Sequence, residues 1–171
     1  VFKCLGKTNE ASALIAQGLS TKEIISVPEQ EFYLTCSLAD QQFNLGQFQQ
    51  ALHTLQGIPK LQGYKFVHQE LRMSVAVFEM VANMECGHFN FIPDQYSDFK
   101  KEYRQLLKTE KHESTSLFVE VLVKANASLE KGKSPNLKKL LPSLMNATKG
   151  GEIGANTNLN YEIYALSKAN D

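Results

Sequence analysis

The side chains best suited to metal binding or nucleophilic chemistry in this chain are four histidines and three cysteines, spread along its whole length. They are His53, His68, His88 and His112, and Cys4, Cys36 and Cys86. Only Cys86 and His88 lie close together, and a single residue separates them, whereas two ligands on one face of a helix need a spacing of about three or four. The tripeptide around Gly87 is therefore favoured as a helix end, and neither a metal site nor any other cofactor is expected.

A cysteine nucleophile needs a base that the fold brings beside it, and nothing in the sequence nominates one for any of the three thiols. Their odd number and wide spacing also fit reduced packing residues better than a disulfide framework. The glycine-rich segment 148–154 lacks the spacing of a phosphate-binding loop and follows no strand, so we expect an inter-helix turn there. The chain is therefore predicted not to be an enzyme.

Positive charge gathers on the exposed side of the helix predicted to begin near Pro93. This basic stripe consists of Lys100, Lys101, Arg104, Lys108 and Lys111. Glu102 and Glu110 lie among these residues, and the whole chain has 18 basic and 18 acidic residues, so its net charge is zero. A neutral chain exerts no long-range attraction on a polyanion, which argues against nucleic acid as a partner. Binding of a small ligand or of nucleic acid would require the basic stripe and a groove to converge.

Apolar residues recur at helical spacing in eight segments, and strand-like alternation is nearly absent, so the fold class is predicted to be all-α. The eight helices are expected at 9–19, 30–45, 47–58, 64–86, 93–107, 113–131, 135–148 and 158–168. Segment 64–86 is apolar on nearly every side and should be buried. Pro142 falls inside the seventh helix, where we expect a kink or an early end.

Four glycines divide the chain at nearly regular intervals of 40, 41 and 45 residues. They are Gly6, Gly46, Gly87 and Gly132. The first two are each followed, five residues later, by an alanine, Ala11 and Ala51. Only Gly adopts the left-handed conformation that ends a helix at no steric cost, and Ala lets the next helix pack closely. The period predicts a solenoid of stacked antiparallel helical hairpins.

One stretch of the chain carries a family resemblance. Leu38-Ala39, followed by Leu45-Gly46-Gln47-Phe48-Gln49-Gln50-Ala51 and Leu55, resembles a tetratricopeptide repeat in the small residue of the first helix, the glycine–aromatic turn and the second alanine. The resemblance is specific around residues 32–58. Leu5-Gly6 with Ala11 and Ile15 resembles the second half of another repeat, so residues 1–171 are expected to form a single repeat domain that starts in the middle of a repeat.

The resemblance implies a right-handed superhelix whose concave face, formed by the first helix of each pair, holds a helix or an extended peptide of a partner. Carried over by position, that face includes Tyr33, Cys36, Asp40, Phe43 and Asn44, and the segment 64–86 adds Val77, Val81 and Met84. Tetratricopeptide domains that bind chaperone tails clamp a terminal carboxylate with basic residues. Cys36 stands where a Lys would be expected, which argues against a chaperone-tail receptor.

The function expected from these features is a non-enzymatic protein–protein interaction module whose partner is a protein or peptide. Alternatively, the chain is a structural solenoid segment that packs on its own missing N-terminal part or associates with a second copy through its N-terminal end. Exposed apolar surface near Val1 would favour this alternative.

No membrane span is expected, because the longest nearly apolar run, Met73 to Met84, is shorter than the roughly 20 residues that cross a bilayer. The cytoplasm is favoured as the compartment. The chain begins at Val1 without Met, which leaves open a removed signal peptide.

Overall fold

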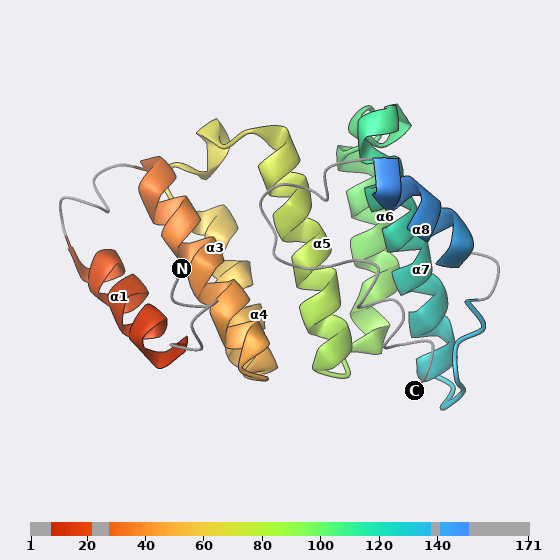
Figure 1. Ribbon diagram of the computed structural model, residues 1–171, viewed down its shortest axis with the longest axis horizontal. Coiled ribbons are helices and arrows are strands. Elements are labelled where there is room, and N and C mark those ends of the chain that lie inside the picture. The colour runs from red at the N-terminus through yellow and green to blue at the C-terminus, as the bar shows by residue number, and fades with distance from the viewer. Residues whose placement is uncertain (1–7, 22–27, 138–140, 151–171) are drawn as a thin grey trace. The chain divides into compact units, whose positions relative to one another are not determined.

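The computed structural model describes residues 8–21, 28–137 and 141–150 of the chain (Figure 1). In these ranges it contains seven α-helices and five short 3-10 helices, and no strand. The all-α prediction is therefore confirmed. None of the described helices is both long and apolar enough to cross a membrane.

Four of the predicted helices agree with the structure to within two residues at each end. The seven α-helices are α1 (Thr8–Ser20), α3 (Pro28–Asn44), α4 (Phe48–Gly57), α5 (Gln69–Glu85), α6 (Ile92–Glu102), α7 (Glu113–Leu129) and α8 (Leu141–Gly150). The close agreement concerns α1, α3, α4 and α7. The helix expected at 158–168 lies outside the described residues.

Two predicted helices are shorter in the structure. The helix expected from Tyr64 begins only at Gln69, because Tyr64–Phe66 forms a separate 3-10 turn, η2, and Val67 is extended. The helix expected to reach Leu107 ends at Glu102, because the backbone leaves the helical conformation at Tyr103. Leu106–Lys108 then forms another 3-10 turn, η4.

The seventh predicted helix, expected at 135–148, does not end early at Pro142. α8 is described from Leu141, passes through Pro142 and continues to Gly150. Residues 138–140 lie outside the described part of the chain, so a kink at Pro142 stays a prediction.

The chain divides into two compact units between Gln69 and Glu70, and each is described by itself. In the first unit α3 packs against both α1 and α4, and α3 and α4 run antiparallel (Figure 1). The buried apolar side chains of these two helices and the following turn are Phe32, Ala39, Ala51, Leu52, Leu55 and Ile58. Ala39 and Ala51 are both 0% exposed, as expected for small residues at a close helix contact. The expectation of a single domain stays a prediction.

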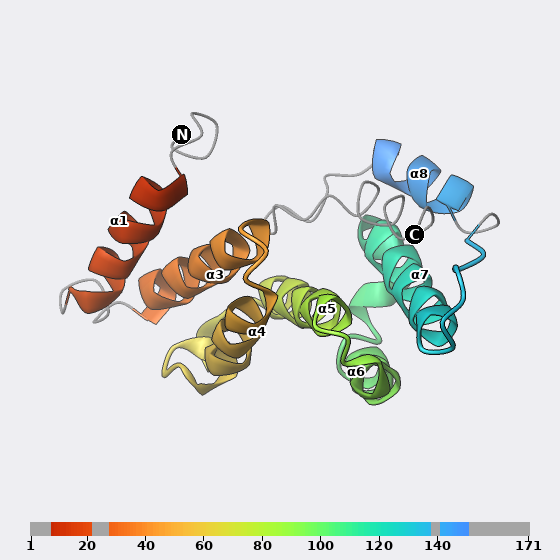
Figure 2. The same ribbon diagram turned by 90° about the horizontal axis from the view of Figure 1, so that it is seen from below.

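In the second unit α7 packs against both α6 and α8 (Figures 1 and 2). α5 has buried side chains at nearly every position from Met73 to Met84, which confirms the burial expected from its sequence. α6 buries Ile92 and Phe99 and exposes its charged side, and α7 buries an apolar face. The buried apolar residues of α7 are Phe118, Val119, Val121, Leu122 and Ala125.

Three glycines end α3, α5 and α7 in the same way. Gly46, Gly87 and Gly132 have φ angles of 75°, 74° and 64°. In each case the glycine N–H donates to the carbonyl three residues earlier, and the next N–H donates to the carbonyl five residues earlier. After α5, for example, the Gly87 N–H lies 3.0 Å from the Met84 oxygen, and the His88 N–H lies 2.9 Å from the Asn83 oxygen. This is the Schellman motif. The predicted role of these glycines is confirmed, and Gly6 lies outside the described residues.

A pair of alanine substitutions tests this cap. A methyl group added at Gly46 or at Gly57 would meet no atom within 4 Å, so only the backbone distinguishes the two sites. The positive φ of Gly46 costs any other residue about 1–2 kcal/mol. Gly57 has a φ of −77°, which alanine adopts without strain. We expect urea unfolding to show a lower free energy of unfolding for Gly46→Ala, and an unchanged or higher value, by up to about 1 kcal/mol, for Gly57→Ala. Equal losses in both variants would contradict the assignment of the cap.

Candidate functional site

Five of the predicted contact residues lie on one face of α3. Tyr33, Cys36, Asp40, Phe43 and Asn44 follow one another at helical steps of three, four, three and one, which keeps them on one side of the helix. Tyr33 is 48% exposed and Asn44 is also exposed, whereas the other three are half-buried. The structure thus places these five residues, called here the α3 face, together. Its contact with a partner stays a prediction.

Aromatic and polar contacts orient the side chains of the α3 face. The Tyr33 ring lies edge-on to the Phe32 ring with 5.5 Å between centroids, and the Phe43 ring lies edge-on to Phe48 of α4 at 5.0 Å. The side-chain amide of Asn44 donates hydrogen bonds to the Asp40 main-chain oxygen and, at 3.0 Å, to the Asp40 carboxylate. Groups held in this way lose less conformational entropy when a partner binds.

The cysteine on the α3 face has the character of a packing residue. Burial raises the pKa of the Cys36 thiol to about 12, so the group is protonated at neutral pH. The pKa of Cys86 is also raised, first by burial and then by the nearby Glu85 carboxylate. Both cysteines are free thiols, and Cys4 lies outside the described residues.

The three predicted contact residues on α5 occupy a different environment. Val77, Val81 and Met84 are 1%, 0% and 4% exposed. Side chains this deeply buried contribute to packing, and a partner does not reach them in this conformation. Of the residues expected to line a groove, those accessible to a partner are therefore on α3.

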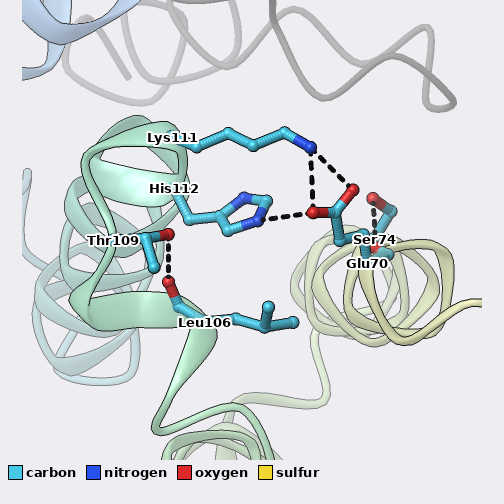
Figure 3. A network of polar contacts seen from close by, with 6 residues as sticks. All are labelled: Glu70, Ser74, Leu106, Thr109, Lys111 and His112. Atoms are coloured by element: carbon cyan, nitrogen blue, oxygen red, sulfur yellow. Dashed lines mark hydrogen bonds and ion pairs between the residues drawn. The ribbon is translucent and has the colours of Figure 1, made fainter.

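A charged cluster links the start of α5 to the 3-10 turn η5 (Glu110–His112), as Figure 3 shows. The Lys111 ammonium donates to both carboxylate oxygens of Glu70 at 2.9 Å, and the His112 ring nitrogen Nε2 lies 3.3 Å from Glu70 Oε1. His112 is buried, with 7% of its surface exposed, whereas Lys111 is exposed. The hydrogen bond from Lys111 is the main cause that lowers the pKa of the Glu70 carboxyl, and partial burial opposes it.

This cluster combines a carboxylate, an imidazole and a nearby serine, and its geometry fits a structural role. The Ser74 hydroxyl donates to the main-chain oxygen of Glu70 at 3.1 Å, one helical turn back (Figure 3). A nucleophilic serine would instead direct its hydroxyl to the imidazole. The cluster holds η5 against the first turn of α5.

His88 belongs to a second polar network, between the end of α5 and α6. Its Nδ1 lies 3.2 Å from the Asn83 side-chain oxygen, and the Asn83 amide donates to the Gln95 side chain at 3.2 Å. Gln95 in turn donates to Glu79 at 3.2 Å. These contacts place the tripeptide around Gly87 at a helix end, as predicted. Among the described residues, no group of three or more His, Cys, Asp or Glu side chains could hold a metal ion.

Two of the five cations of the basic stripe form ion pairs, and the other three do not share these partners. Lys101 pairs with Asp98 at 3.2 Å, and Lys111 pairs with Glu70. The remaining three cations, Lys100, Arg104 and Lys108, line a pocket of about 270 Å³. Its other lining residues are Tyr96, Phe99, Leu107, Ser116, Val119 and Glu120. The sequence contains no motif that links the stripe to α7, so this pocket was missed. Only the packing of α6 and η4 against α7 creates it.

Removal of the Glu70 charge tests the cluster in Figure 3. Because the pKa of Glu70 is lowered in the folded state, its contribution to stability is complete above the ordinary pKa of 4.5 and is lost as the pH falls through the lower, folded value. The carboxylate is 32% exposed, so we expect Glu70→Gln to lower the free energy of unfolding at pH 7 by no more than about 1 kcal/mol. The difference between wild type and variant should vanish in acid.

The matched control is Glu110→Gln, which removes the same charge from an exposed position of η5. Chemical unfolding at several pH values should show a change within about 0.5 kcal/mol for this variant. If Glu70→Gln retained its deficit in strong acid, the ion pair would not be its cause.

Comparison with known proteins assigns no relative to this chain: no protein-family model, no curated protein and no solved structure matches it significantly. The tetratricopeptide resemblance therefore rests on the sequence alone, most specifically on residues 32–58, and stays a prediction.

Proposed function

We propose that this chain is a non-enzymatic, tetratricopeptide-like solenoid that binds a helix or an extended peptide of a partner protein along the α3 face. The observation that carries the proposal is the α3 face itself, where an exposed aromatic ring lies on the same side of one helix as a fixed Asp–Asn pair. No catalytic group and no cofactor form part of the proposal.

Repetition of one structural unit supports the solenoid part of the proposal. α3, α5 and α7 each contain 17 residues, and each ends in a Schellman motif with a left-handed glycine. In a tetratricopeptide-like array such first helices line the concave face of a right-handed superhelix. Stacking of the hairpins would bury the apolar faces that a single hairpin leaves open.

The α3 face offers both affinity and orientation to a peptide. Tyr33 presents a ring that is nearly half exposed, and tyrosine is among the side chains that most often dominate binding energy. The Asp40 carboxylate and the Asn44 amide supply polar groups close to the half-buried Phe43. An apolar anchor beside a polar pair suits a partner helix or strand in which apolar and polar side chains alternate.

Site-specific photo-crosslinking tests this proposal. A photoreactive phenylalanine analogue replaces Tyr33 in one variant and Phe66 in another, because Phe66 is a 72% exposed aromatic residue of the same unit that lies outside α3. We expect the Tyr33 position to crosslink one partner and the Phe66 position to crosslink none above background.

With the partner purified, Tyr33→Ala should weaken its binding at least about tenfold, because truncation of a central aromatic anchor costs about 2 kcal/mol. Phe66→Ala is the control and should change the affinity less than about twofold. Equal weakening by both substitutions would place the contact elsewhere.

One observation favours the second candidate function, self-association through the N-terminal end. Leu14 of α1 is 50% exposed although α1 packs on α3. Apolar surface left open on the outer face of a solenoid helix is available to another copy or another segment. Self-association is thus the alternative to peptide binding as the proposed function of the chain.

Sedimentation of the wild type and of Leu14→Glu separates the two candidates. If the second candidate holds, the wild type dimerises with rising concentration, and the charge at Leu14 weakens dimerisation at least about tenfold, since a carboxylate would enter an apolar contact. Gln17→Glu, at another exposed position of α1, should leave dimerisation unchanged. A wild type that remains monomeric up to millimolar concentration would rule out self-association.

A further inference from the structure

The pocket beside α6 is the place where positive charge and apolar surface meet in the second unit. It is lined by residues of three elements, α6, η4 and α7, and its volume is about 270 Å³. Phe99 and Val119 in its lining are 4% and 1% exposed, and Leu107 is half-buried, so the floor is apolar and belongs to the packed core. The Ser116 hydroxyl adds a polar group from the α7 side.

Three cations surround this floor. Arg104 and Lys108 are exposed, and in the described part of the chain neither forms an ion pair. Lys100 lies over the Tyr96 ring at 5.2 Å from its centroid, which keeps the ammonium at the pocket. Glu120 is the one carboxylate in the lining, so two net positive charges remain there.

We propose that this pocket binds a small amphiphilic anion, a molecule with a short apolar or aromatic body and a carboxylate or phosphate head. The body lies on Phe99, Leu107 and Val119, and the head contacts Arg104 and Lys108 at the exposed side. An arginine guanidinium binds a carboxylate or phosphate through two parallel hydrogen bonds, which gives the head a defined orientation. This site is independent of the α3 face and of the function proposed for it.

The size of the pocket and the position of its charges favour a small ligand over a nucleic acid. A volume near 270 Å³ lies just below the range of about 300–1,000 Å³ typical of small-molecule sites. A nucleic acid needs a track of cations along its backbone. Here Lys101 and Lys111 are already paired with Asp98 and Glu70, which limits unpaired positive charge in the stripe to the pocket.

The test is titration of the full chain with phenylbutyrate, followed by amide NMR spectra. We expect saturable shifts at Leu107, Ser116 and Val119 with a dissociation constant on the order of 1 mM, as suits a ligand of this size. Phenylbutanol has the same body without the charge, and inorganic phosphate has the charge without the body. Each should bind at least about fivefold more weakly.

Two double variants separate local contacts from general electrostatics. Arg104→Gln with Lys108→Gln should weaken phenylbutyrate binding about tenfold. Lys101→Gln with Lys124→Gln removes the same total charge from exposed positions outside the pocket lining and should change binding less than about twofold. All four positions are exposed, so both variants should fold.

Several results would overturn the proposal. If phenylbutyrate and phenylbutanol bound equally well, the cations would contribute nothing to binding. If phosphate alone bound as tightly as phenylbutyrate, the apolar floor would contribute nothing. Equal losses in the two double variants would indicate nonspecific attraction. The proposal also fails if no pocket resonance moves at ligand concentrations on the order of 10 mM, because the ligand then does not bind in the pocket. An oligouridine that shifts these resonances at lower concentration than phenylbutyrate would identify a nucleic-acid surface instead.

Discussion

The reversal of the chain at a left-handed glycine is the constraint on which both units depend. The last turn of a helix leaves carbonyl groups without N–H partners, and at the ends of α3, α5 and α7 two successive N–H groups turn back to satisfy two of them. A side chain at the glycine would strain this backbone conformation. Because the turn uses so few residues, the chain returns beside the helix it has just left. In the first unit it brings Phe48 of α4 against Phe43 of α3, and the two rings then meet edge-on.

The cap after α5 also organises the side chains around it. Asn83 offers its main-chain oxygen to the His88 N–H, and its side chain contacts both the His88 ring and Gln95 of α6. Asn83 is only 2% exposed, and a buried amide is costly unless its hydrogen bonds are made. A shift of α6 along α5 would break the contact to Gln95 and leave the Asn83 amide without this acceptor. The network therefore opposes sliding, which apolar contacts alone resist weakly.

Signals that act within one turn of the chain could be predicted from the sequence, whereas those that depend on distant packing could not. The left-handed glycines and the burial of α5 follow from residue type and periodicity. The apolar period of 135–148 did not show that α8 continues through Pro142 to Gly150. Leu106 and Leu107 continue the apolar spacing of α6, although the helix itself ends at Glu102, before Tyr103. Both side chains are half-buried, as the apolar spacing predicts, but their backbone forms a 3-10 turn where an α-helix was expected.

The same limit applies to the candidate sites, because a side chain's type does not tell whether it faces the core, a partner or a neighbouring charge. Val81 and Tyr33 both lie on predicted contact helices, yet the first is 0% and the second 48% exposed. The basic stripe shows the limit for charge. The pair of Lys101 with Asp98 is local and visible in the sequence, but Lys111 reaches Glu70 across 41 positions of the chain. That distant pair withdraws one cation from the stripe and helps to confine its unpaired charge to Lys100, Arg104 and Lys108. The recognition of an anion proposed for this unit thus depends on which cations the fold neutralises as well as on which the sequence supplies.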